Sequence, residues 1–398
     1  MRFPDDVPTL TDGAVTLRAH NADDVDGVYE QCIDPLSQQW TTVPATYTRR
    51  DAADFVARRA LAWEEDREWG FAIEAEGGAG ASRFGGSISV DPKGSGIGDI
   101  AFGAHPGVRG KGVMTAAARL ILDWGFASKR LRTVTWAANA GNYASWRVAW
   151  RNGFTFEGSS RATLPQRGEA LDAWHGTLLA SDSKEPKTRW LHPIRLEAGG
   201  VVLRDITEAD EQRYVEATTD PETMMWLGAI PLPRTREEFR LMHRSRLLPA
   251  SLGSALRWSI ADAEDDSYLG TINLFGLDGL DYKSGEVGYH VHPDARRRGV
   301  MTTALRLAVR HAFAAERAGG LGLQRVSLGA AATNPASQGV ARAVGFTETG
   351  RDRRCYELDD GSVVDLLRFD RLNEEILRPD LPPPGRAARL RTSTATTR

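Results

Sequence analysis

One stretch of this 398-residue chain occurs twice, and it constrains the fold more than any other feature. Residues 105–115 read His-Pro-Gly-Val-Arg-Gly-Lys-Gly-Val-Met-Thr, and residues 292–302 read His-Pro-Asp-Ala-Arg-Arg-Arg-Gly-Val-Met-Thr. Each copy runs into apolar residues at helical spacing, beginning at Met114 and Met301. A turn rich in glycine and basic residues that opens a helix directs unpaired backbone N–H groups and the helix dipole at an anion. The repeat therefore predicts two loops that bind a phosphorylated ligand.

The rest of the chain repeats with nearly the same offset. Gly112 and Gly299 are 187 residues apart, and the Asn-x-x-Ser sequences that begin at Asn142 and Asn334 are 192 apart. The difference fits a glycine-rich insertion at 319–322. Because this offset is the length of an ordinary domain, we interpret the chain as a tandem duplication. The predicted parts are a first domain at 1–180, a linker at 181–190, a second domain at 191–377 and a disordered tail at 378–398.

Hydrophobic patterning predicts the same order of elements in both halves: a strand, helices, three short strands, the loop with its helix, a strand, a short helix and a final strand. This order indicates a mixed α/β domain, present twice. The predicted strands lie at 15–17, 71–73, 86–90, 100–102, 134–136 and 174–178, and at 201–203, 258–260, 270–274, 287–289, 326–328 and 363–367.

Composition and charge exclude several classes of protein. The formal net charge of −3 gives no electrostatic case for nucleic-acid binding, and no apolar run is long enough to span a bilayer. The first residues lack the apolar core of a secretory signal, so we expect a cytoplasmic protein without nucleic-acid or membrane partners. Cys32 and Cys355 lie in different repeats without metal-ligand spacing, so we expect neither a disulfide nor a metal site.

The two loops resemble the hallmark of the GNAT superfamily of acyl-CoA-dependent N-acyltransferases, Arg/Gln-x-x-Gly-x-Gly/Ala between a central strand and a helix. Residues 109–112 and 296–299 carry most of it, with His-Pro before them and Asn-x-x-Ser and Gly-Phe after them. Together with Glu-Val-Gly-Tyr at 286–289, this set is similar to the branch that contains the ribosomal-protein N-terminal acetyltransferases. The resemblance spans all but the linker and tail. It implies two domains, each a mostly antiparallel central sheet flanked by helices.

The resemblance implies acetyl-CoA as cosubstrate, held by the loop N–H groups at its diphosphate and by an asparagine at its pantetheine arm. The last Gly/Ala of the hallmark is replaced by Met114 and Met301, which the helical spacing places among the buried residues. The alternative is a pair of exposed basic turns, with the asparagines serving only as helix caps. The implied cofactor-binding residues are Ala104, Arg109, Gly110, Lys111, Gly112, Val113, Thr115 and Asn142 in the first half, and Val291, Arg296, Arg297, Arg298, Gly299, Val300, Thr302 and Asn334 in the second.

Acyl transfer to an amine requires the unprotonated amine, so a general base is expected. Asp99 and Glu286, on the strands that lead into the loops, are the candidates. Since half of the side chains of a strand point away from any one site, the alternative is a solvent-facing carboxylate. Ser145 and Ser337 are candidates to stabilise the departing thiolate, and the alternative is a plain serine on a helix surface.

Other residues have predicted roles of less specific kinds. His105 and His292 each precede proline at a strand end, which favours a structural role. Many similar enzymes have a tyrosine acid four residues after the serine, but these positions are alanine in both halves of this chain. Several aromatic residues are candidates to line an acceptor pocket, with core packing as the alternative. They are Trp40, Tyr47, Trp63 and Trp226.

The sequence thus predicts a tandem N-acetyltransferase in which a primary amine attacks acetyl-CoA directly. The acceptor is a small-molecule or peptide amine. Two alternatives remain: one active domain beside a degenerate structural copy, and a protein that binds acyl-CoA or a small molecule without turnover. The oligomeric state is left open, and the two copies are compatible with an internal pseudo-dimer.

Overall fold

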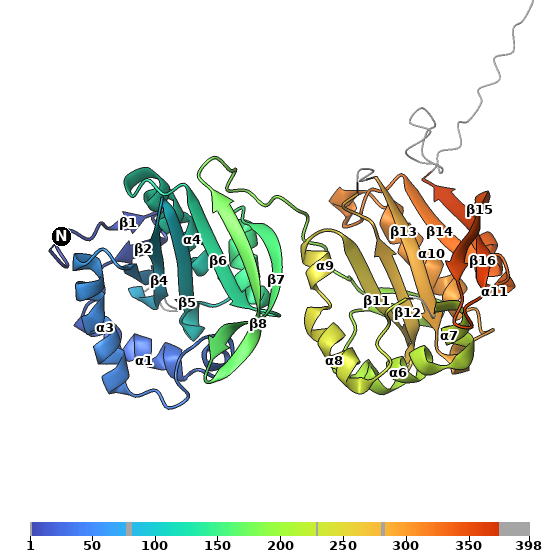
Figure 1. Ribbon diagram of the computed structural model, residues 1–398, viewed down its shortest axis with the longest axis horizontal. Coiled ribbons are helices and arrows are strands. Elements are labelled where there is room, and N and C mark those ends of the chain that lie inside the picture. Colours follow the sequence, from blue (N-terminus) through green and yellow to red (C-terminus); the bar gives the residue numbers. More distant parts are fainter. Residues whose placement is uncertain (1, 77–81, 228–229, 280–282, 374–398) are drawn as a thin grey trace, which may run out of the picture. The chain divides into compact units, whose positions relative to one another are not determined.

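The computed structural model describes residues 2–76, 82–227, 230–279 and 283–373 (Figure 1). The chain divides into two compact units, Met1–Arg189 and Trp190–Arg398. The segment expected to be a linker lies largely against the first unit, where the Trp150 indole donates to the Thr188 carbonyl at 3.1 Å. The chain joins the second unit at Leu191, which is buried in its core and whose N–H donates to Ala250 O at 2.8 Å. The predicted tail at 378–398 lies outside the described residues.

The first unit contains two kinds of element, strands that form one sheet and helices on its two faces. The strands are β1 (Leu10–Thr11), β2 (Val15–Arg18), β3 (Trp69–Glu76), β4 (Ser82–Gly94), β5 (Ile97–Ala104), β6 (Thr133–Asn139), β7 (Thr155–Gln166) and β8 (Glu169–Leu179). The helices are α1 (Val25–Ile33), α2 (Pro35–Trp40), α3 (Arg49–Glu64), α4 (Val113–Ser128) and α5 (Tyr143–Arg151), with short 3-10 turns η1 (Ala22–Asp24) and η2 (Pro106–Val108).

The second unit repeats this order with one additional short helix, α9. Its strands are β9 (Leu196–Ala198), β10 (Val201–Arg204), β11 (Ala255–Asp262), β12 (Tyr268–Phe275), β13 (Ser284–Val291), β14 (Arg325–Ala331), β15 (Thr347–Glu357) and β16 (Val363–Leu372). Its helices are α6 (Glu211–Thr219), α7 (Pro221–Leu227), α8 (Arg236–Ser245), α9 (Leu248–Ser251), α10 (Val300–Phe313) and α11 (Pro335–Ala343), with 3-10 turns η3 (Glu208–Asp210), η4 (Pro293–Ala295) and η5 (Glu316–Ala318).

Each unit is built on an eight-stranded sheet in which one pair of neighbours is parallel. The orders are β1-β2-β3-β4-β5-β6-β8-β7 and β15-β16-β14-β13-β12-β11-β10-β9. The parallel pair β5–β6 is joined only over Ile97–Ile100, and β13–β14 only over Ser284–Glu286, although β5 and β13 continue to Ala104 and Val291. Beyond these short ladders the two central strands of each sheet do not pair with each other in the described residues. A gap therefore opens between the two central strands of each sheet, at the end that leads into the repeated loop.

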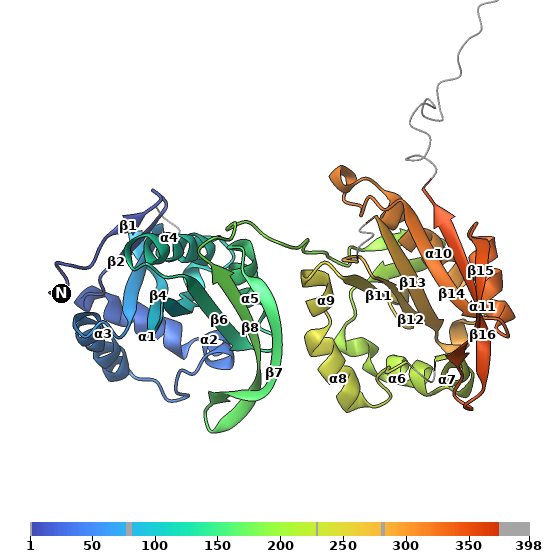
Figure 2. The ribbon, with the colours of Figure 1, turned by 45° about the horizontal axis from the view of Figure 1, so that its top comes forward.

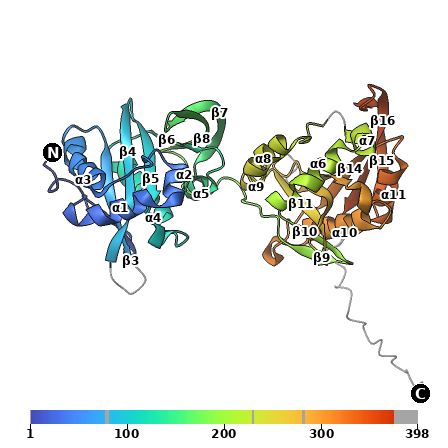
Figure 3. The ribbon, with the colours of Figure 1, turned by 90° about the horizontal axis from the view of Figure 1, so that it is seen from below.

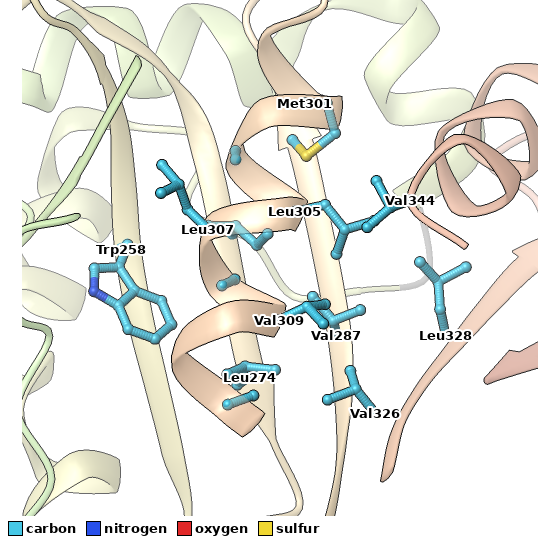
Figure 4. Packing of buried hydrophobic residues seen from close by; sticks show 14 of the residues in the cluster. Trp258, Leu274, Val287, Met301, Leu305, Leu307, Val309, Val326, Leu328 and Val344 are labelled. Atoms are coloured by element: carbon cyan, nitrogen blue, oxygen red, sulfur yellow. The ribbon is translucent and has the colours of Figure 1, made fainter. Parts of the chain in front are cut away.

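Alternation along the strands gives each sheet two different faces. In β13, Val287 belongs to the main core with Met301 and Leu305 of α10, whereas Glu286 and Gly288 point to the opposite face. Figure 4 shows the apolar side chains of α10 directed at Leu274, Val287 and Val326 of the sheet. Replacing a fully buried leucine such as Leu305 by alanine costs about 2–5 kcal/mol in cores of this kind, so this layer fixes the position of α10.

The opposite face of each sheet is covered by the early helices. In the first unit, α1, α2 and α3 lie together over this face (Figure 3), with a small cluster built on Val28, Cys32 and Phe84 beneath them. In the second unit, Tyr214 of α6 and Phe239 of α8 pack on Tyr268 of β12. The loops and their helices lie on the other side of each sheet. We call the face under the early helices the acceptor face. The hydrophobic clusters on this face are small, so polar side chains also lie on it.

The sequence did not predict every element. The second-to-last strands, β7 and β15, were missed, and each forms a long hairpin with the final strand at one edge of its sheet (Figure 2). Both strands contain few apolar residues, so they lack the hydrophobic alternation in sequence that identified the other strands. Within the described residues, no helix is both long and apolar enough to cross a membrane.

Candidate active site

Both repeated loops end in a glycine that begins a helix without a side-chain cap. Gly112 and Gly299 have φ of 82° and 76°, the left-handed region that favours glycine. In the described parts of the chain, the N–H groups of Gly299, Val300 and Met301 have no backbone acceptor, and the same holds for residues 112–114. Met114 and Met301 are buried, as expected from the helical spacing. Each loop therefore presents N–H donors at the positive end of a helix dipole, the geometry that suits an anion.

The basic residues of the loops have different surroundings. Lys111 folds back and donates to Gly107 O at 2.8 Å, and Arg298 lies 3.8 Å from Asp262. Gly110 has φ of 74°, and its counterpart Arg297 adopts φ of 59°. A residue with a β-carbon in this region costs roughly 1–2 kcal/mol relative to glycine. The second loop therefore carries a positive charge where the first has unstrained glycine.

The arginines that open the hallmark hold the loops in place. Arg109 contacts Asp34 at 2.7 Å and the Ser37 hydroxyl at 2.8 Å, at the start of α2. Burial opposes ionisation of Asp34, but Arg109 and the Ser37 N–H together hold the pKa of this carboxyl below its ordinary value. Arg296 repeats the arrangement with Asp220 and with Thr223 Oγ1 at 2.9 Å. Both guanidinium groups are thus bonded to side chains of the same unit. The backbone N–H groups of Arg109 and Arg296 donate within η2 and η4.

The gap between the central strands is lined by free backbone groups. The His292 N–H donates to Leu269 O of β12 at 2.8 Å, and backbone directions alternate along an antiparallel pair. The N–H and C=O groups of Val291 and Tyr289 therefore point away from β12, toward β14. His105 donates to Gly85 O in the same way, which directs Ala104 into the gap of the first unit. An extended ligand with amide groups fits such a row of donors and acceptors.

The Asn-x-x-Ser sequences form matched caps at the other side of each gap. The Asn142 and Asn334 side chains accept the N–H of Ser145 and of Ser337, each at 3.0 Å. Ser145 also accepts a hydrogen bond from the Trp136 indole at 3.0 Å. In the second unit, the Tyr289 hydroxyl instead lies 3.1 Å from Ser337 Oγ. Burial raises the pKa of Tyr289 to about 12, against the smaller effect of the Ser337 hydrogen bond, so the hydroxyl is protonated at neutral pH.

The two candidate bases lie at corresponding places on the acceptor face but have different neighbours. Glu286 is the last residue of the β13–β14 ladder and lies 3.6 Å from Arg368. Asp99 accepts a hydrogen bond from Thr135 Oγ1 at 2.7 Å, and Asp91 lies directly opposite it on β4. Burial, followed by the nearby Glu68 and Asp99 carboxylates, raises the pKa of Asp91.

In the second unit these residues meet in one cavity of about 1350 Å³. The predicted residues that line it are Glu286, Val291, Arg296, Arg297, Gly299, Val300, Thr302, Asn334 and Ser337. Of the aromatic candidates, Trp226 lines the cavity, whereas Trp63 is 1% exposed and packs on Phe71 in the first unit.

Sequence reasoning missed several polar residues of the cavity wall, among them Arg257, Asn273 and Tyr289. Tyr289 belongs to the Glu-Val-Gly-Tyr sequence at 286–289, but no separate role was predicted for it. Arg257 was detectable as the one charged residue in the sequence Leu-Arg-Trp-Ser-Ile. The two loop histidines take structural positions: His105 Nε2 lies 3.1 Å from Glu30, and His292 Nε2 lies 3.3 Å from Glu216.

The family follows from a match to both halves. The model of the acetyltransferase (GNAT) domain matches residues 14–155 and again 201–347, which together are well over half of the chain. The chain belongs to the GNAT family of acetyltransferases. It is a tandem member, because each unit contains one match to the domain, and acetyl transfer is the activity of the family.

Individual relatives correspond to a single GNAT unit. The uncharacterized N-acetyltransferase YoaA of Bacillus subtilis is 24% identical over 175 residues, which are 44% of this chain and 94% of YoaA. The putative ribosomal N-acetyltransferase YdaF of the same organism is 32% identical over 114 residues, 29% of this chain and 56% of YdaF. Mycobacterium smegmatis RimJ, solved in complex with CoA-disulfide, is 22% identical and covers 47% of this chain and 92% of its own, with a TM-score of 0.41.

Proposed function

We propose that this protein transfers an acetyl group from acetyl-CoA to a primary amine by direct attack, and that the second unit carries the active site. The observation on which this rests is the cavity of that unit. Its wall contains the free N–H groups of the loop, the gap between β13 and β14, and the Glu286 carboxylate. Acetyl-CoA, when bound, supplies the acetyl thioester.

The residues present fit acetyl-CoA. The N–H groups of residues 299–301 and the Arg297 guanidinium would hold the diphosphate. The pantetheine amides would bond to the backbone of Val291 and to the Asn334 side chain, which uses its oxygen as a cap and keeps its NH₂ group for a ligand. Gly112, Val113, Ala104 and Asn142 offer the equivalent groups in the first unit.

Glu286 is the proposed general base. It lies on the acceptor face at the point where the central strands separate, so it reaches the nitrogen that attacks from that face. Its carboxylate would accept a proton from the incoming ammonium, directly or through a water molecule. Arg368 at 3.6 Å holds the side chain in place.

The Tyr289 and Ser337 hydroxyls are proposed to stabilise the sulfur that leaves. A phenol with a pKa of about 12 is a weaker acid than a thiol, whose ordinary pKa is about 8.5. Tyr289 would therefore donate a hydrogen bond to the thiolate and keep its proton. Many family members carry a tyrosine acid on the helix, at a position where this chain has alanine. Tyr289 would take the place of that tyrosine.

The proposal is tested by measuring free thiol release from acetyl-CoA with a panel of amines, together with the mass increase of one acetyl group on the product. Gly299→Asp places a carboxylate at the diphosphate site, and Gly299→Asn is the matched neutral control, since both residues tolerate a left-handed backbone. We expect Gly299→Asp to lose most of the activity and Gly299→Asn to lose much less.

Gly112→Asp and Gly112→Asn form the matched pair in the first unit, and we expect both to keep the turnover of the unmodified protein. Loss of turnover in Gly112→Asp but not in Gly299→Asp would assign the active site to the first unit instead. Binding of CoA without thiol release from any amine would contradict the enzyme and support a protein that only binds acyl-CoA.

A further inference from the structure

Arg257 lies on the acceptor face of the second sheet, within the cavity wall. Its neighbours in β11, Leu256 and Trp258, belong to the core under α10, so the Arg257 side chain points to the opposite face. It pairs in register with Asn273 of β12, which pairs with Gly288 of β13. Glu286 lies on the same face, two residues from Gly288. The cavity thus contains a cation and the proposed base on one surface.

The Arg257 guanidinium has no carboxylate partner in the described residues. Its Nε donates a hydrogen bond to Asn273 Oδ1 at 3.2 Å. The cavity-lining Arg246 and Arg296, in contrast, are paired with Asp205 at 3.3 Å and with Glu222 at 2.9 Å. Among the cavity-lining arginines that the structure describes, only Arg297 shares this lack of a partner, and it lies in the loop proposed to bind a diphosphate.

A half-buried charge without a counter-charge is unfavourable, because burial removes water that would otherwise solvate it. The first unit avoids this cost at the equivalent place. There Gly70 replaces Arg257, and the space near Gly70 is taken by Arg59 of α3. Arg59 is paired with Glu68, and its guanidinium lies 4.4 Å from the Phe55 ring centre. The second unit keeps its guanidinium available to a ligand.

We propose that the amine accepted by the second unit also carries an anionic group, a carboxylate or a phosphate, and that Arg257 binds this group while the amine lies at Glu286. This inference rests on the proposed function. Strands about 4.8 Å apart with a rise of about 3.4 Å per residue place the Cα atoms of Arg257 and Glu286 about 12 Å apart. Both side chains extend over the same face, so a small molecule with a few bonds between amine and anion spans the space between them.

The experiment uses pairs of acceptors that differ only in charge. Glycine, β-alanine and 4-aminobutyrate are each compared with their amides, and phosphoethanolamine is compared with ethanolamine, so that carboxylate and phosphate are distinguished. For the full-length protein we expect a lower KM for the anionic member of at least one pair. The spacing between amine and anion in the best pair measures the distance from Glu286 to Arg257.

Arg257→Gln removes the charge and is expected to raise the KM of the anionic acceptors roughly 10- to 150-fold, with little effect on kcat or on the neutral acceptors. Arg257→Lys keeps a charge and is expected to retain part of the preference, which shows that the fold is intact. Arg59→Gln, in the first unit, is the matched control and is expected to leave the preference unchanged.

Equal effects of Arg257→Gln on both members of every pair, or faster acetylation of the neutral members by the unmodified protein, would overturn the inference and leave the proposed function standing. If no amine in any panel releases thiol from acetyl-CoA, the proposed function fails, and this inference fails with it.

Discussion

The two units share a fold and a loop, but they differ at the points where catalysis needs specific groups. In the second unit, Tyr289 approaches Ser337, and Glu286 lies opposite Phe275. In the first, position 102 is phenylalanine, and Ser145 is bonded to the Trp136 indole. The groups that the two units share are mostly backbone N–H groups and the asparagine caps. The groups that differ between them are other side chains. A duplicated domain can thus keep its cofactor loop while its chemistry changes.

The acceptor faces show the same divergence. The first unit places two aspartates opposite each other and neutralises its nearby arginine with Glu68. Its β7–β8 turn also reaches the segment after α2, where Arg167 Nε donates to Val43 O at 3.1 Å. The second unit has Glu286 and the Arg257 guanidinium, which lacks a carboxylate partner in the described residues, in a large cavity. We propose the second unit as the site of turnover, and the following substitutions test this difference.

The largest effect is expected at the proposed base. Glu286→Gln keeps the shape of the side chain but removes its ability to accept a proton, so we expect kcat to fall roughly 10²- to 10⁴-fold. Steady-state thiol release measures this change. Asp99→Asn is the matched variant of the first unit and should leave kcat within a factor of two. An equal loss of kcat in both variants would show that both units catalyse the reaction.

A smaller effect is expected at Tyr289. Tyr289→Phe gives the second unit the residue that the first has at position 102 and removes one hydrogen-bond donor from the departing sulfur. Since a net hydrogen bond contributes about 0.5–1.5 kcal/mol, we expect kcat to fall roughly 2- to 10-fold. The measurement is single-turnover thiol release at saturating acetyl-CoA. An unchanged rate in Tyr289→Phe would assign the tyrosine to packing alone.

The smallest effect concerns stability. The folded-state pKa of Asp91 is raised, mainly by burial and then by Glu68 and Asp99, so its ionised form destabilises the first unit above that pKa. Like charges directly opposite on neighbouring strands cost about 0.2–1 kcal/mol, so Asp91→Asn should stabilise the first unit by this amount at pH 7. The gain should vanish as the pH falls below the unfolded pKa of about 4. Urea unfolding followed by tryptophan fluorescence measures it, and a gain that persists at pH 3 would contradict the electrostatic cause.

Much of the fold and part of the candidate site could be predicted from the sequence. The loops, their helices and the Asn caps are local features, in which a residue's partner lies within a few positions, so the pattern of glycine, apolar and capping residues was sufficient. The buried orientation of Met114 and Met301 followed from helical spacing in the same way. The hairpin strands β7 and β15 were missed because their sequences contain too few apolar residues to show a period of two.

The sequence by itself determined the tandem repeat, its resemblance to GNAT proteins and the two glycine-containing loops that open helices, because a glycine conformation and a helix start depend on neighbouring residues. Only the tertiary structure decided what the side chains contact. Arg296 reaches Asp220 across 76 residues, and Tyr289 reaches Ser337 across 48. The direction of Arg257 follows from a strand whose neighbours are buried under α10. Such contacts depend on which strands and helices lie next to each other. The packing of the whole unit determines that arrangement.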